Sequence, residues 1–376
     1  MDIRSLPIPD RRKALEQELK MDLSILEPRE KTVGHADEKN CEQMFGSVPI
    51  PVGYAGPLHV RFSSGEKTDV HLPLATTEGA LVASVNRGCK ASSMETVRTS
   101  SINHGISRSL AFRVGKDTQS FTQELKKRKA EWTKIAEGTS GHLTLLSHDI
   151  DEQDGHVFFT LNADTDEAMG MNMITIAAQA LGEWAAEQLK VDFVTVAGNV
   201  DSDKKPSLRT YERGRGFEVT AETILTTDTI ETVLKSSAES MLAVAKAKLE
   251  IGSELAGAIG RNLHAANIIA ALYLATGQDA AHVVEGSLTD TYVEQTDNGL
   301  KITVRCPALI VGVRGGGTTL PAQSKCLEML LKQKTKLSPR AQLAESIGAA
   351  VLAGEISLLA AQASHHLTKA HKKMGR

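Results

Sequence analysis

The sequence predicts an α+β protein with a large, mostly helical mixed domain and a smaller ferredoxin-like domain inserted into it. Two observations support this fold class. Between about residues 107 and 197 the periodicity follows the order strand, helix, strand, strand, helix, strand, which is the split βαβ pattern. Long stretches with helical spacing follow it, at 228–274 and 338–369. We therefore expect a helical segment at 1–40, a large domain at 41–106 and 198–376, and the small domain at 107–197.

The chain before the small domain holds the first expected elements. Residues 11–23 have the spacing of one short amphipathic helix. Ser47–Leu58 contains three prolines and two glycines, which exclude a helix and keep the backbone extended. Residues 69–74 alternate as a strand does, and Thr76–Lys90 starts a helix whose small residues permit close packing.

Each element of the small domain has its own signal. Alternation predicts strands, and the turn at Asp151–Gly155 separates the two central ones. Charges or small residues at helical spacing predict helices. The expected strands are Ser109–Val114, Leu143–Ile150, His156–Leu161 and Asp192–Val196, and the expected helices are Thr118–Ala136 and Met169–Leu189.

The chain after the small domain is again mixed. Glycines at 252, 257 and 260 break the long helical region 228–274. We expect strands at Ala221–Thr226, Leu300–Val304 and Ala308–Val313, a glycine turn at Gly315–Gly317, and helices at Pro321–Leu331 and Ser338–Lys369.

The composition of the 376 residues excludes several classes of protein. Lys and Arg number 43 against 46 Asp and Glu, a net charge of −3, and only 4% of residues are aromatic, so neither a nucleic-acid footprint nor a stacking platform is expected. No window approaches the ~18 consecutive apolar residues of a membrane span, and the first thirty residues are not signal-like. The four cysteines form no CxxC pair, so we expect no disulfide framework and no zinc site in a cytoplasmic protein.

Two glycine-containing segments are candidates for binding a cofactor. Gly312–Gly317 follows a strand, but its spacing differs from the GxGxxG turn of dinucleotide-binding folds. Asp166–Met173 (DEAMGMNM) lies where a helix begins, so free N–H groups and small residues there would let a pyrophosphate approach. Core packing is the ordinary alternative for such a run of methionine and alanine.

Four isolated ionisable residues lie among small residues and could carry chemistry: Glu78, Lys204, Asp279 and His371. Each also has an ordinary explanation. Glu78 could be an acid in the first turn of a helix, and Asp279 could be an N-cap. Lys204 could be a solvated loop charge, and His371 a surface histidine near the C-terminus.

Taken together, the motifs resemble those of the hydroxymethylglutaryl-coenzyme A (HMG-CoA) reductases. They occur in that family's order from about residue 40 to the end, in the form found in eukaryotic and archaeal members. We expect a soluble protein without the membrane anchor of the eukaryotic ones. The matching segments are Val48–Leu58 (VPIPVGYAGPL), Ala75–Lys90 (ATTEGALVASVNRGCK), Ala168–Met173 (AMGMNM), Asp203–Pro206 (DKKP), His264–Asn267 (HAAN), Gly277–Asp279 (GQD), Gly315–Thr318 (GGGT) and Leu352–Glu355 (LAGE), which leads to His371.

The resemblance implies a reaction and the roles of four residues. Members of the family reduce the thioester of HMG-CoA twice with a nicotinamide cofactor and release mevalonate and CoA. Lys204 would stabilise the negative charge that forms on the carbonyl oxygen. Glu78 would give that oxygen a proton, its pKa raised by burial beside Asp279, which would lie between Glu78 and Lys204. His371 would protonate the departing CoA thiolate.

The resemblance also implies the binding residues and the assembly. NADPH is expected to bind the small domain, although NADH remains open, and no metal is implied. The active site would lie at a homodimer interface, with the Lys204 loop reaching across it. The substrate-binding residues would be Arg108, Asn199, Asn267, Asn86 and Arg87, and the cofactor-binding residues would be Met169, Gly170, Met171 and Asn172.

Several positions depart from the family's usual pattern, among them the less glycine-rich Gly260–His264 and the lack of a serine after His371. Glu167 replaces an aspartate, Ala197 replaces a serine, and Arg314 replaces an apolar residue. None removes a catalytic group, so the departures affect substrate affinity and cofactor choice more than reaction type. The alternatives are a degradative reductase that uses NAD, a dehydrogenase for another acyl-CoA, and a non-catalytic relative that binds an acyl-CoA.

Overall fold

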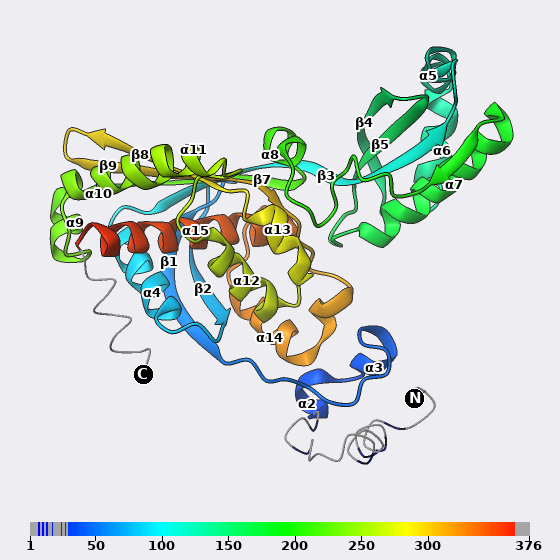
Figure 1. Ribbon diagram of the computed structural model, residues 1–376. Coiled ribbons are helices and arrows are strands. Elements are labelled where there is room, and N and C mark those ends of the chain that lie inside the picture. Colours follow the sequence, from blue (N-terminus) through cyan, green and yellow to red (C-terminus); the bar gives the residue numbers. More distant parts are fainter. Residues whose placement is uncertain are drawn as a thin grey trace.

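The computed structural model describes residues 29–364 and six isolated residues before them, at 7, 10, 13, 17, 24 and 27. Most of the helix expected at 11–23 lies outside the described residues. His371 and residues 365–369 of the helix expected at Ser338–Lys369 also lie outside them. Two parts are visible in Figure 1. A larger part surrounds the red helix α15, and a smaller part with α5, α6 and α7 projects from it, connected through strand β3.

The larger part contains a mixed sheet with the strand order β2-β1-β3-β7-β9-β8. Neighbouring strands are antiparallel except β1 and β3, which run parallel where Val60 pairs with Val97. The strands are β1 (Val52–Arg61), β2 (Lys67–Ala75), β3 (Val97–Arg113), β7 (Gly216–Thr226), β8 (Asp290–Thr296) and β9 (Gly299–Leu309).

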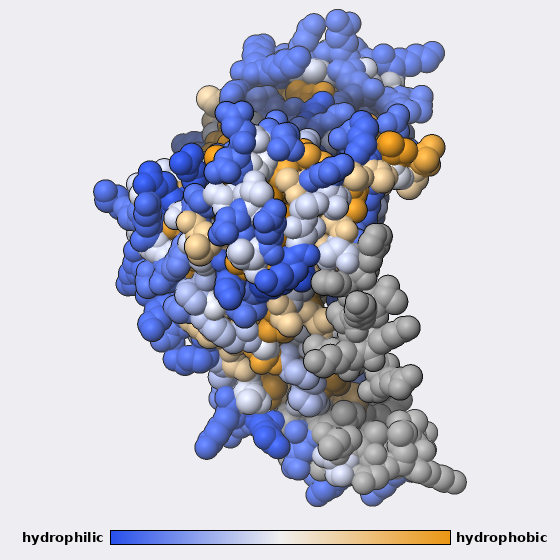
Figure 2. Space-filling model, turned by 90° about the vertical axis from the view of Figure 1, so that its left-hand side faces the viewer, coloured by the Kyte–Doolittle hydropathy of each residue, from blue (hydrophilic) through white to orange (hydrophobic). Residues whose placement is uncertain are grey.

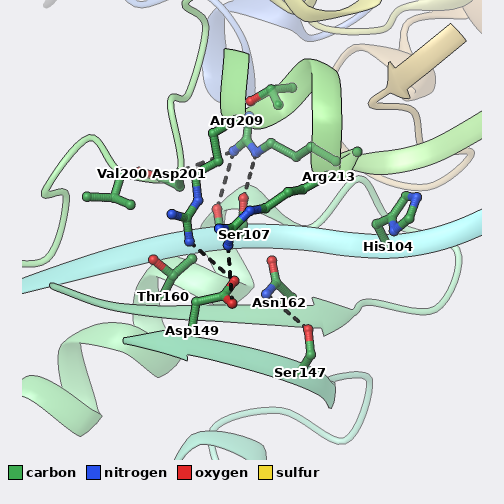
Figure 3. Close-up of a pocket in the computed structure, with 13 residues that line it drawn as sticks. His104, Ser107, Ser147, Asp149, Thr160, Asn162, Val200, Asp201, Arg209 and Arg213 are labelled. Atoms are coloured by element: carbon green, nitrogen blue, oxygen red, sulfur yellow. Dashed lines mark hydrogen bonds and ion pairs between the residues drawn. The ribbon is translucent and has the colours of Figure 1, made fainter. Parts of the chain in front are cut away.

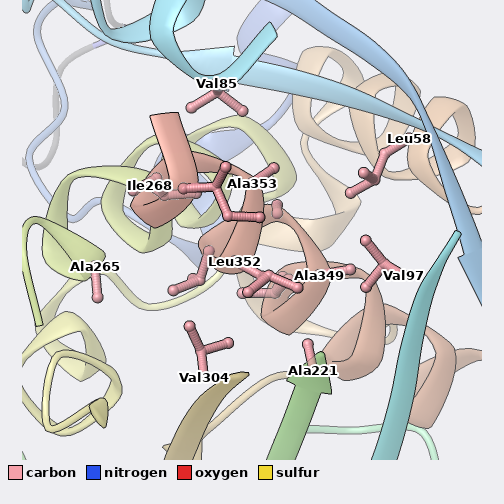
Figure 4. Packing of buried hydrophobic residues seen from close by; sticks show 14 of the residues in the cluster. Leu58, Val85, Val97, Ala221, Ala265, Ile268, Val304, Ala349, Leu352 and Ala353 are labelled. Carbon is pink, nitrogen blue, oxygen red and sulfur yellow. The ribbon is translucent and has the colours of Figure 1, made fainter. Parts of the chain in front are cut away.

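Helix α15 (Pro339–Ala363) passes through the centre of the main core (Figure 4). Ser338 caps it, since its side chain accepts a hydrogen bond from the Ala341 N–H, and Pro339 occupies the first turn, where its missing N–H costs nothing. Among the described residues, α15 is the helix long and apolar enough to cross a membrane, but 94% of that stretch is buried inside the protein. It is therefore a core helix.

Close packing of α15 depends on small side chains. Helix α4 (Leu81–Ser92) lies against it, and a Cβ added at Gly88 would stand 1.8 Å from the Ala353 carbonyl oxygen. Figure 4 shows Val85, Ile268 and Val304 directed toward α15 from α4, α12 (Ala265–Thr276) and β9. Small residues at the contact between α4 and α15 therefore let the two backbones approach closely, while larger side chains fill the rest of the core.

The smaller part has its own antiparallel sheet and its own core. Strand β5 pairs with β4 and β3, and β3 pairs with β6, so the strand order is β4-β5-β3-β6. Trp132 packs edge-on against Phe159 in a second cluster of buried apolar residues. Its elements are α5 (Thr118–Lys127), α6 (Lys129–Glu137), β4 (Thr144–Gln153), β5 (His156–Asp164), α7 (Met171–Leu189) and β6 (Asp192–Thr195).

Strand β3 belongs to both sheets. Its first half, Arg98–Gly105, pairs with β7, and its second half, Ile106–Arg113, pairs with β5. Gly105, at the change of partner, has φ +78°, and a Cβ there would stand 2.6 Å from the Ala163 carbonyl oxygen, so glycine is required.

Short helices connect and cover these sheets. One face of the molecule is hydrophilic over much of its area, with hydrophobic residues in separate small areas (Figure 2). The remaining elements are α2 (Glu30–Val33), α3 (Ala36–Lys39), α8 (Leu208–Arg213), α9 (Thr227–Thr232), α10 (Ala238–Ala245), the π-helix η2 (Lys246–Gly252), α11 (Ser253–Ala256), η3 (Ala280–His282), α13 (Val283–Gly286), η4 (Gly316–Thr319) and α14 (Pro321–Leu330).

The structure corrects the expected strands after residue 290. The two strands expected at Leu300–Val304 and Ala308–Val313 are one strand, β9, which ends at Leu309. Strand β8 was not predicted, because its sequence DTYVEQT is polar and it lies at the edge of the sheet. The larger part is therefore less helical than predicted, because it contains a broad mixed sheet besides its helices.

Candidate active site

Lys204 and Asp279 form an ion pair in the structure. Nζ of Lys204 lies 2.7 Å from Oδ2 of Asp279, and the other carboxylate oxygen accepts a hydrogen bond from the Ala281 N–H at 3.0 Å. Burial alone would raise the pKa of Asp279, but the hydrogen bonds from Lys204 and Ala281 outweigh it, so this pKa lies below its usual value. Both side chains keep about a third or more of their surface exposed, 41% and 34%, so a ligand can reach the pair.

The loop that carries Lys204 is strained. Three of its non-glycine residues, Asn199, Ser202 and Lys204, have φ values of 66°, 54° and 57° in the left-handed region. Such conformations cost of order 1–3 kcal/mol each and persist only where surrounding contacts fix them. Two backbone contacts do so here: Gly198 N–H donates to the Ser109 carbonyl at 2.6 Å, and Lys204 N–H donates to Glu285 Oε1 at 2.6 Å. The loop is thus held at both ends.

A buried cluster of charges lies behind this loop. The guanidinium of Arg215, whose side chain is 2% exposed, donates to Asp203 Oδ1 and to Glu285 Oε1 at 2.9 Å each. Burial would raise the pKa of Asp203, but Arg215 outweighs it and the pKa is lowered. Burial prevails at Asp201, whose pKa is raised despite Arg215 and Arg108. The cluster therefore fixes the loop through charges of both signs.

Arg108, expected to contact the substrate carboxylate, belongs to this cluster. Its Nη1 lies 3.4 Å from Asp201 and 3.9 Å from Asp203, and its Nε donates to Thr175 of α7 at 3.1 Å. The side chain is 13% exposed. The structure thus brings Arg108 to the Lys204 loop, with Nε and Nη1 already engaged inside the chain.

Glu78 is not brought to the pair within one chain. It lies in the exposed turn between β2 and α4, where its N–H donates to Thr76 Oγ1 at 3.0 Å. Among the described residues of this single chain, neither Lys204 nor Asp279 contacts it. The expected burial of Glu78 beside Asp279 is not formed within one subunit, and a meeting of the two across a homodimer interface stays a prediction.

The other expected substrate-binding residues lie in different surroundings. Asn86 accepts a hydrogen bond from the Gly56 N–H at 3.0 Å, and Arg87 donates to the Ser357 carbonyl at 2.6 Å, so both connect α4 to its neighbours. Burial lowers the pKa of Arg87. Asn199 is exposed on the Lys204 loop, and Asn267 lies half-buried in the first turn of α12.

The segment expected to bind the cofactor forms the tight turn before α7. Gly170 has φ +93°, and a Cβ there would stand 2.2 Å from Thr165 Oγ1, so only glycine fits. Arg340 of α15 donates to the Ala168 carbonyl at 2.8 Å and holds this turn against the central helix. Met169 is half-buried and Met171 is buried, while Asn172 is exposed in a first turn without acidic residues.

A small cavity of about 120 Å³ lies beside Val200 and Asp201 of the Lys204 loop, between α8, β3, β4 and β5 (Figure 3). Arg209 and Arg213 extend from α8 toward the acidic residues of β4. Arg209 lies 3.3 Å from Asp149 and 3.0 Å from Asp151, and Arg213 lies 3.4 Å from Asp149. These ion pairs connect the helix that follows the Lys204 loop to the smaller part.

Glu285, Arg215 and His282 were missed by reasoning from sequence. All three are buried and charged or titratable, and they hold the Lys204 loop or lie beside Asp279. A signal existed for Glu285, which stands in the otherwise apolar Val283–Gly286. A buried charge is rare without a partner. The partner, Arg215, lies too far along the chain to be inferred.

Comparison with known proteins gives one consistent result. The sequence model of the family described as hydroxymethylglutaryl-coenzyme A reductase matches residues 7–376. The chain is 41% identical to the 3-hydroxy-3-methylglutaryl-coenzyme A reductase of Methanocaldococcus jannaschii over 360 residues, which cover 91% of this chain and 86% of that protein. It is 38% identical to reductase 1 of Dictyostelium discoideum over 361 residues, 89% of this chain and 62% of that protein.

Solved structures share the fold. A class II 3-hydroxy-3-methylglutaryl-CoA reductase from Streptococcus pneumoniae, bound to NADPH in open conformations, superposes with a TM-score of 0.71 at 17% identity, covering 96% of this chain and 100% of that one. At this identity the likeness concerns the arrangement of the mixed α and β elements alone.

Proposed function

The chain belongs to the hydroxymethylglutaryl-coenzyme A reductase family of oxidoreductases, and on that premise we propose that it reduces (S)-HMG-CoA to mevalonate and CoA with two molecules of NADPH. The observation that carries the proposal is the 2.7 Å ion pair of Lys204 with Asp279 on a strained, anchored loop. The product would serve the mevalonate pathway, which supplies isoprenoid precursors.

Lys204 is the group that stabilises the reacting oxygen in this proposal. Each hydride step places negative charge on a carbonyl oxygen, and a fixed cation beside it lowers the barrier. Asp279 keeps the ammonium charged and aimed, because its own pKa is lowered and it stays ionised. The anchors on Gly198 and Lys204 prevent the loop from relaxing, so the cation needs little reorganisation during the reaction.

Glu78 and His371 complete the proposed chemistry from outside this pair. We assign Glu78 as the acid that protonates the reduced oxygen and His371 as the acid that protonates the CoA thiolate. The exposed position of Glu78 supports an active site at a homodimer interface, where the Lys204 loop of one subunit meets Glu78 of another. Exposed apolar side chains such as Val48 (77%) and Leu255 (84%) are suited to such contacts.

Substrate binding is assigned to residues around the Lys204 loop. Arg108 would share its guanidinium between Asp201, Asp203 and the carboxylate of the HMG group, a contact that the resemblance implies. Asn199 and Asn267 would bind polar atoms near the reacting carbon. Asn86 and Arg87 would lie in the same pocket, with part of their hydrogen-bonding capacity already used inside the chain.

We assign the cofactor to the smaller part, residues 107–197, as a ferredoxin-like domain inserted between 41–106 and 198–376. Its strand order β4-β5-β3-β6 is the order of a split βαβ unit, which supports the assignment. Met169, Gly170, Met171 and Asn172 are assigned to a nicotinamide dinucleotide, and the first turn of α7, which carries no acidic residue that would repel a pyrophosphate, supports the assignment. The bound cofactor would supply the hydride.

NADPH rather than NADH is proposed from the family resemblance and is tested directly by initial rates with each cofactor at equal concentrations. The cytoplasmic location stays a prediction from the sequence. Both are independent of the assignments to Lys204 and Asp279.

One assay tests the proposal. The full chain, given (S)-HMG-CoA and NADPH, should oxidise two NADPH for each mevalonate formed. Lys204→Met should lower kcat by about 10²–10³-fold, the usual effect of removing one donor to a developing oxyanion. Lys301→Met is the matched control, since Lys301 is 37% exposed and pairs with Glu222 at 2.9 Å. Absence of mevalonate from the wild-type chain would disprove the function, and an active Lys204→Met would disprove the role of Lys204.

A further inference from the structure

His282 is a buried histidine beside the ion pair, and the proposed function does not yet use it. Its side chain has no exposed surface. It ends η3, the short helix that Asp279 caps, so the two residues lie on one turn of chain. Nε2 of His282 lies 3.8 Å from Oδ2 of Asp279, the same oxygen that contacts Lys204.

The other side of the imidazole contacts Glu285. Nδ1 of His282 lies 3.3 Å from Glu285 Oε1, which also accepts the Lys204 N–H at 2.6 Å and Arg215 Nη1 at 2.9 Å. His282 therefore connects two carboxylates that hold the same lysine. Asp279 holds the ammonium of Lys204, and Glu285 holds its backbone.

Two buried atoms of this arrangement have no hydrogen-bond partner among the described residues, Nε2 of His282 and Oε2 of Glu285. A buried polar atom without a partner is unusual in a folded protein and costs free energy. At 3.8 Å, Nε2 is beyond hydrogen-bond distance of Asp279, but a small shift of either side chain would close the gap.

The charged and titratable groups that surround His282 are of both signs. Asp279, Glu285 and Asp203 are the acidic neighbours, and Arg215 and Lys204 supply positive charge to the same carboxylates. Tyr273 of α12 is also buried close to Glu285 and Asp279. The imidazole therefore lies between the two carboxylates that hold Lys204.

We propose that His282 is a positioning residue of this active site, which keeps Asp279 and the Lys204 loop in one arrangement by bridging Asp279 and Glu285. Nδ1–H donates to Glu285 and fixes the ring. Nε2 faces Oδ2 of Asp279 at 3.8 Å, and the buried ring limits how far this carboxylate can move away from Lys204, so the ion pair keeps its geometry through the reaction. This inference rests on the proposed function, because it takes Lys204 as the cation of the reaction.

Two substitutions separate the two contacts. The amide of His282→Asn would lie near the position of Nδ1 and could donate to Glu285, while the amide of His282→Gln would lie near Nε2 and could donate to Asp279. Neither variant titrates. His148→Gln is the matched control, because His148 is a partly buried histidine that packs against Trp132 in the smaller part, on another element.

Steady-state kinetics are the first measurement. Both His282 variants should lower kcat about tenfold with a much smaller change in KM for HMG-CoA, because the ammonium is misplaced mainly with respect to the charged transition state. His282→Gln should retain more activity than His282→Asn, and kcat and KM of His148→Gln should match the wild type. A wild-type kcat in both His282 variants would overturn the inference, even if those variants unfolded at a lower temperature.

Amide hydrogen exchange of residues 199–205 gives a second measurement that needs no activity. The Lys204 N–H bonded to Glu285 should exchange faster in both His282 variants than in the wild type and in His148→Gln. Unchanged exchange would overturn the inference even if the wild type reduced HMG-CoA normally. A wild type without reductase activity but with the expected exchange result would disprove the proposed function and leave the bridge of His282 supported.

Discussion

Glu167 accepts a hydrogen bond from the backbone N–H of Arg340, with 2.9 Å between Oε2 and N. The N–H belongs to the first turn of α15, where the helix has no internal acceptor for it. Glu167 itself stands in the turn before α7, and its own carbonyl accepts the Val313 N–H at 2.8 Å. One side chain thus joins the turn assigned to the cofactor to the central core helix.

This contact predicts the effect of Glu167→Asp, which would restore the family's usual residue. The shorter side chain should no longer reach the Arg340 N–H, and the free energy of unfolding should fall by about 1 kcal/mol, as for loss of a helix cap. Glu167→Gln keeps the length of the side chain, so its free energy of unfolding should fall by less. Urea denaturation of the three proteins measures the difference. Equal stability of wild type and Glu167→Asp would show that the cap contributes nothing.

Asp203 should make stability depend on pH in a defined direction. Its folded pKa is lowered, so the ionised carboxylate contributes stability above the unfolded value of about 3.9, and this contribution is lost as the pH falls through the folded value. Asp203→Asn should therefore be less stable than wild type at neutral pH, and the difference should shrink below about pH 4. Urea unfolding at several pH values measures it.

Asp201 serves as the control of opposite sign. Burial raises its pKa, so in the wild type its ionisation costs stability as the pH rises from the unfolded value through the folded one. The free energy of unfolding of Asp201→Asn should therefore rise relative to that of the wild type over that pH range. The same pH trend in both variants would contradict the assignment of the two pKa directions.

Gly88→Ala should destabilise the protein strongly. The new Cβ would meet the Ala353 carbonyl oxygen at 1.8 Å, so α4 and α15 would have to move apart, and overpacking of this kind costs typically 1–3 kcal/mol and occasionally more. Gly141→Ala is the control, since no atom lies within 4 Å of its added Cβ, and it should stay within about 0.5 kcal/mol of wild type. Thermal unfolding compares them, and equal effects would contradict the close approach.

Arg209 and Asp151 should be energetically coupled. The pair joins α8 to β4 at 3.0 Å and is about three-quarters buried on the arginine side. A double-mutant cycle with Arg209→Met and Asp151→Asn should give at most about 1 kcal/mol at low salt, and less at high salt. The exposed pair Arg113–Asp192 is the control and should give a smaller value. Coupling that does not fall with salt would indicate packing rather than charge.

Local signals predicted most of the elements. Proline and glycine in Ser47–Leu58 excluded a helix, and the chain there is extended and continues as β1. Alternation located β2, β5 and β6 to within a few residues. The helix expected over Thr118–Ala136 is divided at Arg128 into α5 and α6, a break that charged residues at helical spacing do not reveal.

The candidate site was only partly predictable. Motif resemblance selected Lys204 and Asp279, which the structure pairs, but it could not show that Glu78 stands apart from them in one chain. Whether these residues lie close together depends on long-range packing, as does the burial of Arg215. The local sequence does not show which distant charged residue will pair with a buried one.

The sharing of β3 between two sheets limits how this protein can be divided. A recombinant fragment that starts at residue 107 would receive only the outer half of that strand and would lose the Ile106 pairing with Ala163. It would also lack Arg98–Gly105, the half of the strand that pairs with β7 in the other sheet. A fragment that contains only the smaller part should therefore begin no later than Gly105, where β3 changes its pairing partner from β7 to β5.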